Sequence, residues 1–416
     1  MIVAVPKETF PGEKRVATTP GAVPALMKLG LSVRVESGAG LAAGFTDEQY
    51  RQRGAEIVED RASLYAEAGL IAQVRTPGAN PDEGAGEIGQ LRPGQVLVGH
   101  AEPLTASEPI GAICEAGATL LAMELIPRIT RAQSMDALSS QANLAGYKAV
   151  LLAADRMAKA LPMFMTAAGT IKPAKVFVIG AGVAGLQAIA TAKRLGAVVS
   201  ATDVRPATKE QVESLGAKFV MVEEAMAEGE GGYAKELTPE QREKQKQLVA
   251  DVVAESDIVI TTAAIPGRKA PTLIDEAMVE RMQPGAVVMD LAAERGGNCE
   301  LTEPDRVVEK HNVTIIGTTN LPSTVSHDAS AMYANNVVKL LGEFVKDGEA
   351  SFDMDNEVVA GCLVCRGGEV HHPRVREAMG LAPIEKPAAS SGADGVGGEG
   401  GEDGEDGSSD EGSGAS

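Results

Sequence analysis

The residues best suited to chemistry form a glycine-rich turn. Its sequence is Gly180-Ala181-Gly182-Val183-Ala184-Gly185, and it separates an apolar, strand-like run from an apolar-periodic, helix-like run. In such a turn the first glycine makes a tight bend, the second lets the backbone approach a pyrophosphate, and the third lets the helix lie close to the strand. The free N–H groups of the helix then face the anion. This pattern predicts a dinucleotide site.

An acidic residue follows the turn at the spacing that a dinucleotide site requires. Asp203 ends a second β-rich run, Val198–Thr202, about 20 residues after the turn. A carboxylate at this place accepts hydrogen bonds from the adenosine ribose and repels a 2′-phosphate. The sequence therefore favours NAD over NADP, although Arg205, two residues further on, weakens that preference slightly.

The turn needs a sheet to hold it, and residues 138–328 supply suitable strands. Six β-rich runs predict a doubly wound parallel sheet. They are Lys175–Ile179, Val198–Thr202, Lys218–Val220, Asp257–Thr261, Ala286–Asp290 and Val313–Ile316. Two polar segments, 290–298 and 320–324, follow strands of this set, so we expect them to face the cofactor crevice.

The segment before residue 137 also alternates β-rich runs with helical runs such as 21–29, which predicts a second parallel sheet covered by helices. Its five predicted strands are Ile2–Val5, Ser32–Glu36, Leu70–Val74, Gln95–Val98 and Thr119–Ala122. No glycine fingerprint occurs there. A charged loop over residues 7–20 follows the first strand and is either a ligand loop or a solvated surface loop. A helix over 330–346 returns towards this region, and Val358–Cys365 is predicted to be a last strand.

A polar loop over residues 127–143 leads into a helix that we expect to run to about Leu161, where Pro162 stops it. The loop carries arginine, glutamine, aspartate and serine side chains, which suit recognition of an amide and a carboxylate. It is also typical of a helix start capped by Asp136 or Ser134. Spacing alone favours the cap.

Residues 223–235 form an acidic, glycine-rich segment whose one aromatic residue is Tyr233. A capping box at Thr238 and Gln241, with Pro239 as the first helical residue, predicts a clean helix start directly after it. The segment is either a mobile lid over the crevice or a plain surface insertion.

Composition restricts the function further. The chain has 416 residues, enough for two domains, and a formal charge of −20. Nine acids and one base lie between Glu385 and Ser416, so −8 of that charge belongs to a tail that cannot bury a core and is predicted to be disordered. The acidity argues against nucleic acid or an anionic membrane as a direct partner. It is compatible with a salty cytoplasm and equally with an ordinary cytosolic enzyme.

Cysteine and membrane signals point to a reducing compartment. Four cysteines in a chain of this size do not form a secreted disulfide framework. No signal peptide is visible, and no run of about 18 uncharged apolar residues occurs. We therefore expect a soluble or peripheral protein.

Two further motifs invite a functional interpretation. Cys362 and Cys365 lie near two histidines, as in half a zinc site, but residues three apart on a strand point to opposite faces and no second pair exists. Buried cysteines and no metal are predicted. Among the histidines, only His100, near the crevice, is a candidate acid or base.

Taken together, these segments resemble the NAD(H)-binding alpha subunit of proton-translocating NAD(P) transhydrogenase, which is related to alanine dehydrogenase. The resemblance covers about residues 1–384. It rests on residues 7–20, the 128–143 loop, the glycine turn with Asp203, the 231–239 segment and residues 290–298. The 128–143 and 231–239 segments are specific to the transhydrogenase subunit.

The resemblance implies an α/β protein with two Rossmann-like, doubly wound parallel-sheet domains around a nucleotide cleft, and the disordered acidic tail. The first domain is then discontinuous, 1–137 with 329–384, and the NAD(H)-binding domain is 138–328. A homodimer is implied, together with partner subunits that bind NADP(H) and span the membrane, so that this chain is a peripheral subunit on the cytoplasmic face of the inner (plasma) membrane.

The resemblance also implies roles for particular residues. Four of them contact the nicotinamide end of NAD and are the predicted catalytic set: Arg128, Gln133, Asp136 and Ser139. Tyr233 belongs to a loop that closes over the nucleotide. The predicted cofactor-binding set is Gly180, Ala181, Gly182, Val183, Ala184, Gly185, Asp203, Val204, Arg205, Gly232, Tyr233 and Ala264.

The alternative is a true alanine dehydrogenase. Oxidising an amino acid requires a group that handles a proton and cations that hold the carboxylate. The alanine enzymes carry Lys and Asp at the positions of Arg75 and Glu294, whereas Arg15 is retained. A nucleotide-sensing module without redox turnover is a third possibility.

Overall fold

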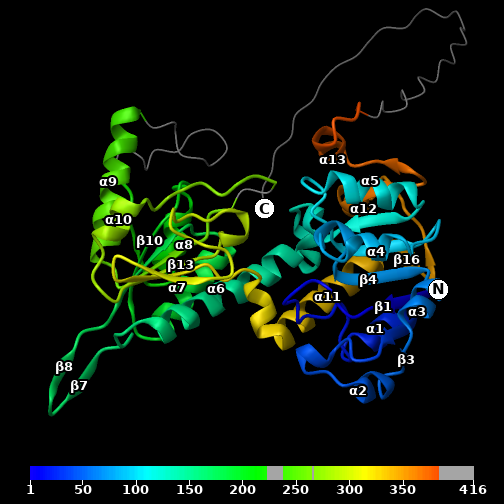
Figure 1. Cartoon of the computed structure of the whole chain (residues 1–416), viewed down its shortest axis with the longest axis horizontal. Coiled ribbons are helices and arrows are strands. Elements are labelled where there is room, and N and C mark those ends of the chain that lie inside the picture. Colours follow the sequence, from blue (N-terminus) through cyan, green and yellow to red (C-terminus); the bar gives the residue numbers. More distant parts are fainter. Residues whose placement is uncertain (223–237, 265–266, 384–416) are drawn as a thin grey trace, which may run out of the picture.

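Two α/β lobes make up the computed structural model, which describes residues 1–222, 238–264 and 267–383. Figure 1 shows the lobes side by side, joined by the long helices α6 (Ala137–Arg156) and α11 (Ser326–Phe344). Blue, cyan and orange segments occur together in the first lobe, so both ends of the described chain build it, whereas the second lobe is green and yellow.

The first lobe is built on an eight-stranded sheet. Its strands are β1 (Ile2–Val5), β2 (Ser32–Glu36), β3 (Glu56–Val58), β4 (Leu70–Arg75), β5 (Val96–His100), β6 (Thr119–Ala122), β18 (Leu363–Arg366) and β19 (Glu369–Val370). The order is β19-β18-β6-β5-β4-β1-β2-β3. The strands β1 to β6 pair in parallel in the 3-2-1-4-5-6 order of dinucleotide-binding folds, and β18 and β19 add an antiparallel edge.

The second lobe repeats this strand order. Its strands are β9 (Lys175–Ile179), β10 (Val198–Thr202), β11 (Lys218–Phe219), β12 (Ile258–Thr261), β13 (Val287–Asp290), β14 (Val307–Lys310) and β15 (Val313–Ile316). The order β11-β10-β9-β12-β13-β15-β14 is parallel except for β14, which pairs antiparallel with β15. These two sheets confirm the predicted fold class.

Both sheets bury side chains on both faces, which explains why their strands read as apolar runs rather than alternating ones. In the first lobe Val3 and Val5 enter one core and Ala4 enters the other. In the second lobe Val176 and Val178 face one core, while Phe177 and Ile179 face the opposite one.

Most other helices are short and cover these sheets. They are α1 (Val23–Lys28), α2 (Asp47–Arg51), α3 (Arg61–Glu67), α4 (Gly84–Ile88), α5 (Ser107–Glu115), α7 (Val183–Arg194), α8 (Thr208–Ser214), α9 (Pro239–Glu255), α10 (Glu276–Glu280), α12 (Glu357–Cys362) and α13 (Pro373–Ala378). The predicted capping box is confirmed at α9, where Thr238 accepts from the N–H of Gln241. Among the described residues, no helix has both the length and the apolar character needed to cross a membrane.

Three sequence predictions need correction. The predicted strand Val358–Cys365 is wrong over its first five residues, because Asn356 accepts from the N–H groups of Val358 and Val359 and starts α12; only Leu363–Arg366 is a strand. The helix expected to reach Leu161 ends at Arg156, since Met157 is extended and packs into the second-lobe core. The sheets are not purely parallel, because their edges are antiparallel.

A projecting hairpin was not predicted. The strands β7 (Phe164–Thr166) and β8 (Gly169–Ile171) pair with each other and extend away from the second lobe (Figure 1). Their apolar side chains are exposed, with Met165 at 77%. The boundaries of the predicted domains stay predictions, and the acidic tail from residue 384 onward lies outside the described residues.

Candidate nucleotide site

The glycine turn lies between β9 and α7, and two of its glycines are required by the fold itself. Gly180 has φ +103°, and a Cβ there would lie 2.4 Å from Oγ1 of Thr262. A Cβ on Gly185 would lie 1.8 Å from the carbonyl oxygen of Gly180. Neither position can accept a side chain, because α7 returns so closely to the end of β9.

Gly182 differs from its neighbours. Its φ is −77°, and a Cβ there would meet no atom within 4 Å. The fold therefore does not require glycine at this position. Gly182 is the N-cap of α7, and no side chain caps the helix. Open space beside free N–H groups fits the predicted pyrophosphate, which a Cβ at this position would obstruct.

The carboxylate of Asp203 is held at the end of β10 by four hydrogen bonds. Oδ2 accepts from the N–H of Ala181 at 2.7 Å and from Nη2 of Arg205 at 3.0 Å. Oδ1 accepts from the backbone N–H and Nε of Arg205, at 2.8 and 2.9 Å. Burial alone would raise the pKa of Asp203, but these bonds to Arg205 and Ala181 outweigh it and hold the pKa below its usual value. Asp203 is therefore ionised at neutral pH.

The strand order reverses between β9 and β12, and ligands of such sheets bind at this point. The segment after β12 carries the predicted Ala264, which is exposed. The fully buried amide of Asn298 positions this segment: it accepts from the N–H of Ala263 at 3.0 Å and donates to the carbonyl of Ala263 at 2.8 Å. Oγ1 of Thr262 lies 3.1 Å from the Gly180 carbonyl oxygen.

Thr262 is a contributor that the sequence interpretation missed. No pattern in the β12 region distinguishes it from its neighbours, and its contact with Gly180 becomes visible only when β9 and β12 are paired. Asp290 was expected to face the crevice, but its side chain is fully buried and accepts from the N–H groups of Ala292, Asn298 and Cys299. It shapes the loop rather than the crevice.

Helix α6 brings the polar loop to the glycine turn. A Cβ on Gly146 would lie 2.1 Å from the carbonyl oxygen of Ala184, so α6 crosses α7 in direct backbone contact at the first turn of α7. The start of α6 lies about 14 Å along its axis from that crossing, at 1.5 Å per residue. Asp136 caps α6 as predicted: Oδ1 accepts from the N–H of Ser139 at 2.9 Å, and Oδ2 accepts from its hydroxyl at 2.5 Å.

Two members of the predicted catalytic set are free to meet a ligand. Arg128 and Gln133 are exposed, and neither side chain has a hydrogen bond or ion pair to another described residue. Their neighbour Arg131 has a structural role, since it pairs with Glu343 at 2.8 Å and donates to Asn356 at 2.7 Å. Whether the four predicted residues contact nicotinamide stays a prediction.

A buried polar cluster lies where the two lobes meet. Arg15 donates twice to Glu13, with the shorter contact 2.6 Å, and also to Gln141 of α6 at 3.0 Å and Asn320 at 3.1 Å. Burial would raise the pKa of Glu13, but the charge of Arg15 lowers it to about 2. Arg15 is thus already neutralised by its own chain.

Arg75 and Glu294 form an ion pair across the lobes. Nη2 of Arg75 lies 3.1 Å from Oε1 of Glu294, and its guanidinium lies over the ring of Phe10, 4.0 Å from the ring centre. A second pair joins Arg295 to both carboxylate oxygens of Glu102, each at 2.9 Å. Adjacent residues of the second lobe therefore hold the first lobe at two points.

Glu8 lies beneath this cluster. The register of β4 against β5 shifts between Ala72 and Arg75, and Glu8 accepts from the N–H groups of Val74 and Arg75 at 2.6 and 3.1 Å. Burial, followed by the charge of Glu13, raises the pKa of Glu8 to about 8. The charged loop over residues 7–20 is therefore largely a buried network and not a solvated surface.

His100 ends β5 with Nδ1 3.6 Å from Oε2 of Glu124. Glu124 also accepts from the N–H groups of Ala101 and Glu102, at 2.8 and 2.7 Å. The carboxylate therefore fixes the loop that follows β5 as well as facing the imidazole.

The cysteine pair does not offer a metal site. Cys362 packs in one core of the first lobe and Cys365 in the other, on opposite faces of the sheet. Burial raises the pKa of each thiol to about 12. The thiolates that zinc requires are not available there.

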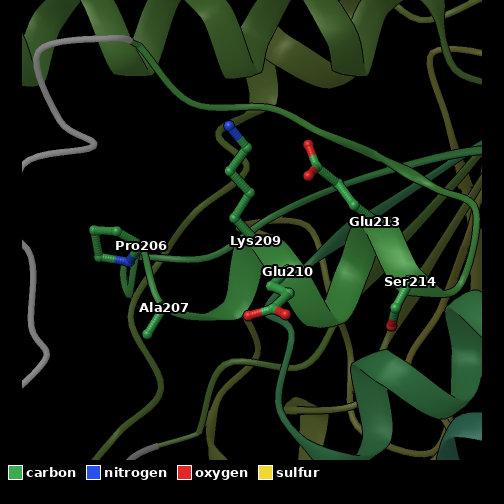
Figure 2. A pocket seen from close by; sticks show the side chains of 6 residues that line it. All are labelled: Pro206, Ala207, Lys209, Glu210, Glu213 and Ser214. Carbon is green, nitrogen blue, oxygen red and sulfur yellow. The ribbon is translucent and has the colours of Figure 1, made fainter.

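An open hollow of about 460 Å³ lies beside α8, directly after Arg205. Figure 2 shows its lining, with Lys209 and Glu213 extending to one side of α8 and Glu210 to another. None of the predicted site residues lines it. Two predicted residues, Gly232 and Tyr233, lie outside the described residues, as does the predicted lid over 223–235.

Comparison with known proteins gives a consistent picture over nearly all the described chain. The family described as "Alanine dehydrogenase/PNT, N-terminal domain" matches residues 4–145, and "Alanine dehydrogenase/PNT, C-terminal domain" matches residues 149–373. The chain is 51% identical to an NAD(P) transhydrogenase subunit alpha of Rhodospirillum rubrum over 378 residues, 90% of this chain and 98% of that protein. It is 30% identical to "Alanine dehydrogenase" of Bacillus subtilis over 396 residues, 93% of this chain and 97% of that one.

Solved structures agree in fold. The crystal structure of transhydrogenase from Sinorhizobium meliloti superposes with a TM-score of 0.80 at 49% identity and covers 89% of this chain and 100% of that one. An L-alanine dehydrogenase superposes with a TM-score of 0.75 at 24% identity, covering 91% and 99% of the two chains. The latter likeness is one of fold.

Proposed function

Because the chain belongs to the alanine dehydrogenase/PNT family, with transhydrogenase alpha subunits among its relatives, we propose that it is the NAD(H)-binding subunit of a proton-translocating NAD(P)⁺ transhydrogenase. In this proposal it binds NADH and passes the hydride to NADP⁺ on a partner subunit. A separate membrane-spanning subunit couples the transfer to proton movement.

The observation that carries this proposal is the geometry of the glycine turn. Gly182 is open although the fold does not need glycine there, and it lies at the uncapped start of α7. Asp203, ionised and buried, contacts the same turn through the N–H of Ala181. A pyrophosphate at the helix start and a ribose at the carboxylate would satisfy both features.

The chain's contribution to hydride transfer is position. When bound, reduced nicotinamide supplies the hydride, and no proton is exchanged at the carbon. Arg128 and Gln133 have side chains free to hold the carboxamide end, and Asp136 with Ser139 fixes the start of α6 beside them. Transfer needs the two ring carbons within about 3–3.5 Å with water excluded, which these residues and a docked partner would provide.

The polar cluster favours this function over alanine oxidation. The two positions at which this chain departs from the alanine enzymes, Arg75 and Glu294, pair with each other. The retained Arg15 is engaged by Glu13, Gln141 and Asn320. An amino-acid carboxylate would have to displace these contacts, so the cations that should hold it are occupied.

Assembly is also included in the proposal. The exposed apolar residues of the β7–β8 hairpin, Met163, Phe164, Met165 and Ile171, would be buried if the hairpin packed on a second copy, which supports a homodimer. Docking to a membrane-spanning partner would make the chain peripheral on the cytoplasmic face of the plasma membrane.

The test is reduction of an NAD analogue by NADPH, measured with the chain alone and with a matching NADP-binding subunit. Turnover is expected only in the pair, and Gln133→Ala should slow it more than it weakens NADH binding. Oxidation of alanine by the lone chain would establish the alternative. NADH binding without turnover in the reconstituted pair would indicate a sensing module.

A further inference from the structure

Asp203 has no acceptor position left for a ribose in the structure described here. A carboxylate offers about four lone-pair positions, and the four donors on Asp203 fill them. Two are backbone N–H groups, of Ala181 and Arg205, which the fold fixes in place. The other two belong to the Arg205 side chain, one on each oxygen.

Only the Arg205 side chain can yield its place. Its side chain is 42% exposed, whereas that of Asp203 is 6% exposed. A dinucleotide ribose presents two neighbouring hydroxyls, which match the two oxygens that the guanidinium now contacts through Nε and Nη2. Both the guanidinium and the diol offer paired donors to one carboxylate, so they compete for the same positions.

We propose that Arg205 acts as a stand-in for the ribose, occupying Asp203 in the free protein and leaving when a dinucleotide binds. This inference rests on the proposed binding of NAD(H). Pro206 and Ala207, directly after Arg205, line the open hollow of Figure 2 together with Glu210 and Glu213. The released guanidinium thus has room and acidic neighbours on the side away from the glycine turn.

The stand-in also affects the choice between dinucleotides. While Arg205 contacts Asp203, the positive charge partly screens the carboxylate that should repel a 2′-phosphate. Removing Arg205 therefore exposes both the acceptor positions and the negative charge. NADH binding should tighten and discrimination against NADPH should increase, although the variant has lost a cation near an anionic ligand.

The experiment measures NADH and NADPH dissociation constants by calorimetry for the wild type, Arg205→Ala and the control Arg194→Ala. Arg194 is an exposed arginine at the opposite end of α7, about 18 Å from its start. We expect NADH to bind Arg205→Ala about three- to tenfold more tightly, the ratio of NADPH to NADH constants to rise, and Arg194→Ala to stay within about twofold of the wild type.

Unchanged or weaker NADH binding by Arg205→Ala, with wild-type binding intact, overturns the stand-in and leaves the proposed function standing. A wild type that binds no NADH overturns both. A second measurement follows the Nε–H signals in ¹⁵N-arginine spectra, with the Arg205 signal identified by its loss in Arg205→Ala. It should shift when NADH is added to the wild type, and a Nε–H signal that stays in place at NADH saturation refutes the release.

Discussion

Replacing glycines of the turn one at a time separates the demands of the fold from those of the ligand. Alanine at Gly182 meets no atom within 4 Å and accepts the local φ of −77°. Alanine at Gly185 places Cβ 1.8 Å from the carbonyl oxygen of Gly180 and 2.9 Å from its carbon. Both contacts are to backbone, which cannot turn aside. The two variants should therefore fail in different ways.

The magnitudes follow from these contacts. Gly182→Ala should change the stability of the second lobe by less than about 1 kcal/mol, which is under about 4 °C in melting temperature. Its methyl group keeps a pyrophosphate from the helix start, and losing one charge-assisted hydrogen bond costs about 1.5–3 kcal/mol. NADH should bind about ten- to a hundredfold more weakly. Gly185→Ala should cost about 1–3 kcal/mol or more through overpacking.

Thermal unfolding followed by circular dichroism measures the first quantity, and calorimetric NADH titration measures the second. Gly182→Ala should melt with the wild type and bind poorly, whereas Gly185→Ala should melt earlier. If Gly182→Ala bound NADH with wild-type affinity, the pyrophosphate would not lie at Gly182 and the assignment of this turn as the phosphate site would fail.

Three further perturbations test other regions of the structure. Asp203→Asn should narrow the preference for NADH over NADPH by about tenfold in binding assays, because the repelling charge is lost; an unchanged ratio would remove Asp203 from specificity. Gly146→Ala should lower the melting temperature, since its Cβ meets the Ala184 carbonyl, whereas Gly86→Ala in α4, with no atom within 4 Å, should not. The folded pKa of Glu8, about 8, lies above its ordinary 4.5, so its stabilising contribution is present below about pH 4.5 and disappears as the pH rises towards 8. The melting temperature of Glu8→Gln relative to the wild type should therefore rise between pH 5 and 8, and parallel profiles would contradict the burial argument.

Local signals were sufficient for the elements of the fold that the sequence predicted well. Strands such as Val198–Thr202 and Val313–Ile316 are continuous apolar runs between turn residues, and buried parallel strands have that appearance. Asp136 and Thr238 cap their helices through contacts three residues away, so spacing alone identifies them. The segment 358–365 was misread because its valines favour a strand, whereas Asn356 and burial in the first-lobe core favour a helix.

The candidate site was predictable only where its contacts are short in sequence. The glycine turn and Asp203 lie in one strand-helix-strand unit with a known spacing. The contacts of Thr262 with Gly180, of Asn298 with Ala263 and of Arg75 with Glu294 join segments that are 35 to 219 residues apart. These pairs depend on strand order and lobe packing, which no local pattern encodes.

The antiparallel edge of the first lobe has a consequence for synthesis on the ribosome. Strand β6 ends at Ala122, but its partner β18 begins at Leu363. At about 5–20 residues per second, the residues between them take about 10–50 s to appear. All strands of the second sheet, from Lys175 to Ile316, emerge within that interval. We therefore expect the lobe that is second in sequence to finish folding first, while the edge of β6 waits uncovered for its partner.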